Sequence, residues 1–126
     1  MDLQEIREKV KHYILENEYV SYAELEQFFE QIGYDYHGSF SSVSSVCDYV
    51  VFWSGWSKEA IDLVNDLYDE GIHKQPTPIL TYILDGATLN LPLVKRDMQY
   101  KKSHWLPVVF HSISNQRGVR QKTYRW

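Results

Sequence analysis

One helix, bounded at both ends by unambiguous signals, constrains the fold of this chain most strongly. Residues 21–24 form a capping box, in which Ser21 and Glu24 satisfy backbone N–H groups of the first helical turn. Gly33 supplies the left-handed residue at which helices commonly end. Between these signals the apolar side chains recur at helical spacing, at Leu25, Phe28, Phe29 and Ile32. The pattern predicts an amphipathic helix with one buried face.

Further elements are expected on both sides of this helix. Asp2 is a suitable N-cap for a helix from Leu3 to Glu16, and Ser57 and Gly71 delimit a third helix. The β-branched and aromatic run 49–53 predicts a strand, followed by a turn at Ser54-Gly55. Shorter strands are expected at 72–75, 79–84 and 89–93, and residues 34–48 are expected to form a loop. Three helices, a short strand and a C-terminal β-hairpin predict an α+β fold of the winged helix-turn-helix type.

Charge divides the chain into two parts. Residues 95–126 contain eight Lys and Arg residues against one acid, Asp97, a net charge of +7. Residues 1–94 contain five basic and sixteen acidic residues, a net charge of −11. We therefore expect a winged-helix-like body over 1–94 and a basic, aromatic-bearing tail over 95–126, disordered towards the C-terminus. The tail could bind a polyanion, neutralise the acidic body or dock an acidic protein.

Signals for catalysis, metals, cofactors and membranes are missing from the sequence. Cys47 is the only cysteine, and the five histidines are scattered singly, so no metal site and no disulfide are expected. No glycine-rich phosphate loop is present, and no cofactor is expected. The acids Asp62, Asp66 and Asp69 share one face of the third helix, which is typical of a solvated face. We expect a cytoplasmic protein that is not an enzyme and has no membrane partner.

Lysines, arginines and aromatic residues occur together in two places, as in proteins that bind single strands through phosphate contacts and base stacking. The residues predicted to bind DNA are Lys74, Lys95, Arg96, Tyr100, Lys101, Lys102 and Trp105. The residues predicted to line a partly open apolar pocket on the body are Phe52, Trp53, Trp56 and Tyr82. The alternative for this second group is complete burial in the core.

The end of the chain is expected to bind protein partners. A mixture of arginine and large aromatic residues is enriched at protein interfaces. The predicted partner-binding residues are Arg117, Arg120, Tyr124, Arg125 and Trp126. Replication helicases and polymerases are the partners considered for this segment.

Three segments carry a family resemblance: 51–57, the wing-like 72–93 and 101–110. Together they resemble the small winged-helix single-stranded-DNA-binding proteins that are encoded beside replication genes in staphylococcal cassette chromosome elements, with similar proteins in related phages and islands. The resemblance implies a role in replication or transfer of a mobile element, an apolar pocket on the body and a tail available to partner proteins. It does not assign individual DNA contacts.

The sequence therefore favours a single-stranded-DNA-binding accessory protein. Two alternatives remain, a duplex-binding transcriptional regulator and an adaptor for replication proteins. A duplex reader needs basic or amide side chains on its recognition helix. The third helix offers Lys58 and Asn65, but it also carries the acids at 59, 62, 66 and 69, which disfavours the regulator.

Overall fold

The first two helices form where their capping signals predict. The computed structural model describes residues 1–95 and 100–113, and its first helices are α1 (Leu3–Asn17) and α2 (Tyr22–Ile32). The Asp2 carboxylate accepts a hydrogen bond from the backbone N–H of Glu5, and the Ser21 hydroxyl accepts one from the N–H of Glu24. The Glu24 carboxylate, however, accepts from the Tyr13 hydroxyl, so it ties α2 to α1.

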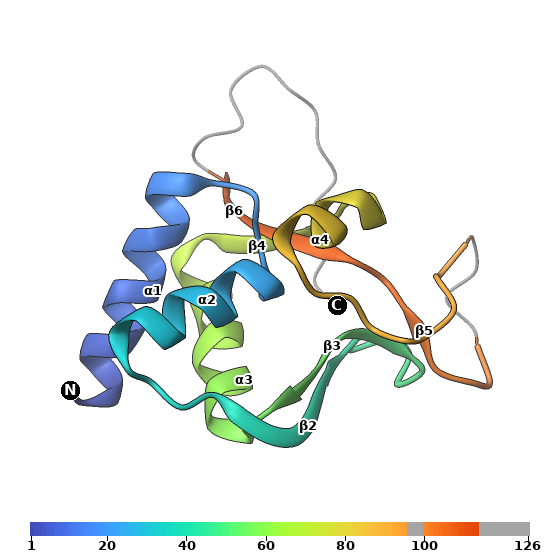
Figure 1. Ribbon diagram of the computed structural model, residues 1–126, viewed down its shortest axis with the longest axis horizontal. Helices are drawn as coiled ribbons and strands as arrows, with labels where there is room; N and C mark the ends of the chain where they lie inside the picture. The colour runs from blue at the N-terminus through green and yellow to red at the C-terminus, as the bar shows by residue number, and fades with distance from the viewer. Residues whose placement is uncertain (96–99, 114–126) are drawn as a thin grey trace.

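Two small sheets lie beside these helices (Figure 1). The first is antiparallel, in the order β1-β6-β4, with β1 at Val20–Ser21, β6 at Val108–Ser112 and β4 at Ile72–Pro76. The second has the order β2-β3-β5, with β2 at His37–Val43, β3 at Val50–Trp56 and β5 at His104–Trp105. Strands β2 and β3 are antiparallel, whereas β3 and β5 are parallel.

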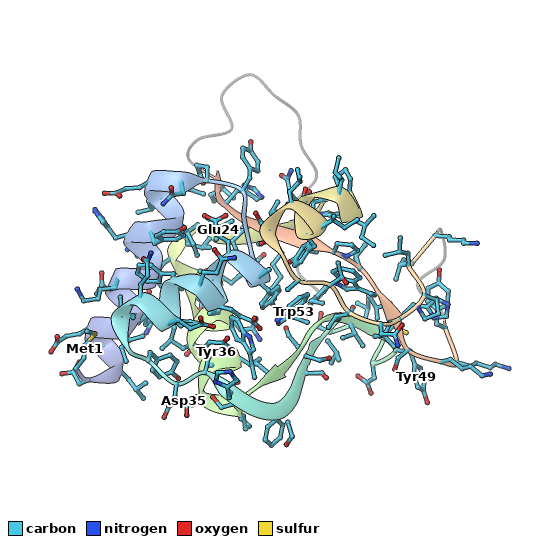
Figure 2. All side chains as sticks on the ribbon, in the orientation of Figure 1. Met1, Glu24, Asp35, Tyr36, Tyr49 and Trp53 are labelled. Carbon is cyan, nitrogen blue, oxygen red and sulfur yellow. The ribbon has the colours of Figure 1, made fainter. Side chains whose placement is uncertain are left out.

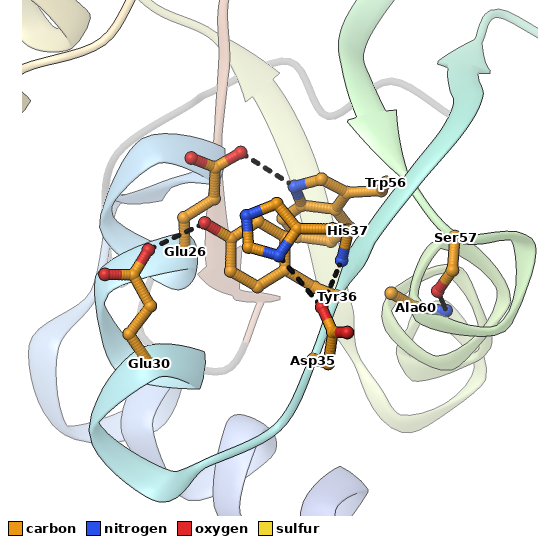
Figure 3. Close-up of polar contacts among 8 residues, drawn as sticks. All are labelled: Glu26, Glu30, Asp35, Tyr36, His37, Trp56, Ser57 and Ala60. Carbon is orange, nitrogen blue, oxygen red and sulfur yellow. Dashed lines mark hydrogen bonds and ion pairs between the residues drawn. The ribbon is translucent and has the colours of Figure 1, made fainter.

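The third helix begins at its predicted cap. The Ser57 hydroxyl accepts from the N–H of Ala60, and α3 runs over Lys58–Asn65 (Figure 3). A 3-10 helix, η1 (Asp66–Glu70), continues it to Gly71, whose φ of 89° ends the helical segment as expected. Because the apolar side chains of α3 pack inward, its acidic residues remain on the solvent side.

The predicted loop over 34–48 and the predicted turn at Ser54-Gly55 are wrong. Strand β2 takes up residues 37–43 of the predicted loop, and β3 runs through the two turn residues to Trp56. The side-chain oxygens of Ser41 and Ser54 are 2.8 Å apart, so a hydrogen bond joins the two strands at this point. Strand β2 is an exposed edge strand with mostly small polar side chains, and it therefore lacks the alternating apolar pattern that would have identified it.

The predicted wing is also absent from the described residues. Residues 79–84 belong to a fourth helix, α4 (Ile79–Asp85), and 89–93 form no strand apart from an isolated bridge between Leu93 and Trp105. Pro78 precedes α4, and Gly86, with φ of 94°, ends it. The α+β class is confirmed, but the described chain has four α-helices instead of three, and the winged-helix arrangement is not confirmed.

The predicted domain boundary at residue 94 is wrong. Strands β5 and β6 come from the predicted tail, and β6 is the central strand of the first sheet. All of β6 is buried, and α4 lies over it (Figure 1). The Tyr82 hydroxyl donates to the Val108 carbonyl at 2.5 Å and accepts from the N–H of Tyr22 at 3.1 Å, which links α4, β6 and α2. Residues 1–94 therefore share one core with residues 104–112.

Among the described residues, no helix combines the length and the apolar character needed to cross a bilayer.

The buried histidine of β6 makes fold stability depend on pH. His111 stacks on Tyr19, and burial lowers the pKa of its imidazole. The unfolded chain therefore takes up a proton near the ordinary histidine pKa of about 6.5, before the folded protein does. The urea midpoint should therefore fall as the pH is lowered through and below about 6.5. His111→Gln should flatten that fall, and an equally steep fall in the variant would contradict the assignment.

Candidate nucleic-acid interface

The four residues predicted to line an open pocket are core residues, so this prediction is wrong. Phe52, Trp53, Trp56 and Tyr82 are all at least 96% buried in the described structure. Trp53 packs against both Tyr22 and Tyr82, while Trp56 packs against Tyr22 and Phe29. Complete burial, the alternative considered for these residues, is what the structure has.

A carboxylate on α2 holds the two indole groups, and the sequence patterns did not identify it. Glu26 accepts hydrogen bonds from Trp53 Nε1 at 2.7 Å and Trp56 Nε1 at 2.9 Å. Beside it, the Tyr36 hydroxyl donates to Glu30 at 2.7 Å (Figure 3). Burial and these nearby carboxylates raise the pKa of Tyr36. The arrangement satisfies the polar atoms of a buried aromatic cluster, which is a structural role.

Trp105 cannot stack on a base, contrary to its predicted role. It is fully buried, at 0% exposure, and its Nε1 donates to the Phe52 carbonyl at 3.1 Å. Its ring packs against Trp53 and Tyr82. The basic segment that precedes it is therefore attached directly to the core.

Lys74 belongs to the first sheet and not to the basic segment that follows α4. It lies on β4 and is partly buried, with its Nζ 2.8 Å from Asn65 Oδ1 and 4.9 Å from the centre of the Phe52 ring. Burial lowers its pKa to about 8. This environment gives no support to the predicted phosphate contact of Lys74.

Three of the predicted DNA-binding lysines lie together on the segment between α4 and β5. Lys95, Lys101 and Lys102 are exposed, and none of them forms an ion pair with any acid in the described parts of the chain. Arg7 and Lys11, by contrast, both bind Glu70. We call the described residues of this segment, Lys95 and 100–102, the lysine loop. Arg96 is outside the described residues.

Tyr100 and His104 anchor the lysine loop. The backbone N–H of Lys95 donates to the Tyr100 hydroxyl at 2.9 Å, and the Tyr100 ring stacks on the His104 ring with centroids 3.9 Å apart. His104 Nδ1 donates to the Lys102 carbonyl at 2.8 Å. One tyrosine and one histidine thus fix both ends of the loop, and Tyr100 has one face already covered.

His104 also connects the lysine loop to Tyr49. Its backbone N–H donates to the Tyr49 carbonyl at 2.8 Å, at the point where β5 pairs with β3. Tyr49 is 47% exposed and lies at the end of the molecule opposite α1 (Figure 2). The sequence patterns did not indicate a binding role for Tyr49, because residues 49–53 were predicted to form a strand. The position of Tyr49 at the start of the apolar run 49–53, directly after Asp48, was the signal that the sequence offered.

Exposed ammonium groups that pair with no acid among the described residues lie here beside an exposed aromatic ring, a combination suited to a single-stranded polyanion. The exposed acids of α3 lie on a different element, between β3 and β4 in the chain. The predicted partner-binding residues Arg117, Arg120, Tyr124, Arg125 and Trp126 lie outside the described residues. Within the described residues, no group of three or more His, Cys, Asp or Glu side chains could hold a metal ion.

Comparisons with protein-family models, with curated proteins and with solved structures find no match to this chain, and the interface is therefore interpreted from its own residues.

Proposed function

We propose that this protein binds single-stranded DNA through the lysine loop, as an accessory protein in the replication or transfer of a mobile genetic element. The observation that carries the proposal is the set of three exposed lysines, without an acidic partner among the described residues, on a loop fixed to the core. The family resemblance of the sequence supports the biological setting.

Electrostatics explains why an acidic protein can bind DNA at this position. Lysine side chains that contact phosphates release condensed counterions, and this release drives binding. The loop presents its charges at one end of the domain. The anchors at Tyr100 and His104 reduce the conformational entropy lost when the loop binds.

The structure supports duplex recognition by α3 less than it supports single-strand binding by the lysine loop. A recognition helix must approach the major groove with its outer face. The outer face of α3 carries exposed acids at positions 59 and 62, Asp66 follows at the start of η1, and Lys58 is already paired with Asp62 at 2.7 Å. Phosphate groups would be repelled from this face.

The proposal is tested by fluorescence anisotropy with single-stranded and duplex oligonucleotides of equal length, over a range of salt concentrations. Replacing Lys95, Lys101 and Lys102 together by glutamine should weaken single-strand binding. Because each phosphate contact contributes about 0.7 to the log–log salt slope, the slope should fall by about 2. Lys9→Gln, an exposed lysine on α1, is the matched control and should leave the slope unchanged.

Three results would overturn the proposal. One is an unchanged affinity and slope in the triple variant, and another is a preference of the wild-type protein for duplex. The third is the absence of any binding at low salt, which would favour the adaptor alternative.

A further inference from the structure

We propose that Tyr49 is the residue that selects single strands over duplex, because its ring stacks on an unpaired base held beside the lysine loop. This inference rests on the proposed function, and it adds the chemical group that is recognised.

Tyr49 offers an exposed aromatic ring that no other ring covers in the described structure at this end of the protein. The tryptophans of the described chain, Trp53, Trp56 and Trp105, are all buried in the core. The Tyr100 ring is stacked on His104. Tyr49 is half-exposed, and within the described residues no aromatic ring packs against it. A base could therefore stack on Tyr49 without displacing a side chain from the core.

The backbone on both sides of Tyr49 is fixed. The N–H of Val50 donates to the Cys47 carbonyl at 3.0 Å, and the N–H of Ser44 donates to the Val50 carbonyl at 2.9 Å, which closes the turn between β2 and β3. The Tyr49 carbonyl itself accepts from His104. An aromatic ring on such a turn loses little conformational entropy when it binds a ligand.

The same contacts place Tyr49 beside the positive charges. His104 bonds to Tyr49 through its backbone and to the Lys102 carbonyl through its imidazole. A strand whose phosphates contact Lys101 and Lys102 can thus present a base to Tyr49. In a duplex the bases are paired and stacked on one another, so the Tyr49 ring could contact none without unstacking it, which costs a few kcal/mol. Lysine side chains bind the phosphates of single strands and duplexes alike, so the preference for single strands comes from the aromatic ring.

The test compares Tyr49→Ala and Tyr49→Phe with the wild-type full-length protein, on a single-stranded oligonucleotide and on a duplex of the same length. Since a stacked base contributes roughly 1–3 kcal/mol, Tyr49→Ala should weaken single-strand binding about 5- to 150-fold. Duplex affinity and the salt slope should not change, because no charge is removed. Tyr49→Phe retains the ring and should bind within about twofold of the wild type.

A second measurement does not depend on the folding of a variant. The wild-type protein should bind a strand with abasic sites throughout as weakly as Tyr49→Ala binds the normal strand, and the two losses should not add. Equal affinity of Tyr49→Ala and wild type for single strands would overturn the role of Tyr49, whereas the triple lysine variant would still report on the proposed function. If Tyr49→Ala weakens single-strand and duplex binding equally, the residue contributes to affinity but does not select single strands, and the inference is also wrong.

Discussion

A chain that ends at Val94 should not fold into a stable domain. The truncation removes β6, which pairs with both β1 and β4, so the first sheet loses its central strand. It also removes the buried side chains of Trp105, Val108 and Phe110 from a single core. Deleting one large buried residue costs roughly 3–5 kcal/mol, and a small domain is stable by only about 5–15 kcal/mol. Losing Trp105 and Phe110 alone should cost roughly 6–10 kcal/mol, which is comparable with the whole stability, and the loss of the central strand adds to it.

The matched control for this truncation is a chain that ends at Ile113, which keeps every strand of both sheets. We expect a cooperative thermal transition for the control, followed by far-ultraviolet circular dichroism, and none for the chain that ends at Val94. A cooperative transition in the shorter chain, with dispersed amide signals in its NMR spectrum, would show that residues 1–94 fold independently.

Local signals predicted three of the four described helices because the causes of helix ends are local. Asp2, Ser21 and Ser57 cap their helices through bonds to residues three positions away, and Gly33 and Gly71 end helical segments with positive φ. Each of these features lies within a few residues of the element it controls. The α+β class followed from them correctly.

Strand pairing was not predictable in the same way, because the partner of β4 lies far along the chain. Ile72 pairs with Ser112. The sequence had instead predicted that the strand at 72–75 pairs with the nearby apolar run 79–84 in a hairpin. A short apolar run does not distinguish a strand from a helix. In the structure Pro78 precedes this run, and Tyr82 alone is buried while Leu80, Ile83 and Leu84 face outward. The tertiary contacts of Tyr82 with β6 favour the helix.

Three of the lysines predicted to bind DNA are exposed, whereas Lys74 is partly buried and Trp105 is fully buried. Lysines are rarely buried, so sequence alone placed Lys95, Lys101 and Lys102 on the surface. The position of an aromatic side chain depends on packing across the whole domain. Trp105 lies three residues beyond Lys102 and is fully buried, whereas Tyr49 begins an aromatic run and is half-exposed. Composition near a basic segment therefore selected a tryptophan that the structure buries.

Trp56→Ala should destabilise the protein by roughly 3–5 kcal/mol, because it removes one of the largest fully buried side chains. The Trp56 ring makes edge contacts with Tyr22 and Phe29, and its Nε1 is bound to Glu26. The substitution leaves a cavity between α2 and β3. Urea unfolding followed by circular dichroism measures the loss.

Trp56→Phe separates the contribution of ring packing from the contribution of the hydrogen bond to Glu26. It keeps an aromatic ring between Tyr22 and Phe29 and removes the hydrogen bond to Glu26, which would still accept from Trp53. A hydrogen bond to a charged group contributes about 1.5–3 kcal/mol, so this variant should lose less stability than Trp56→Ala. An open apolar pocket at Trp56 would give the opposite pattern, with near wild-type stability in both variants and weakened DNA binding. Because Trp56 is buried and does not touch the lysine loop, we expect Trp56→Phe to bind single strands with unchanged affinity wherever the protein remains folded.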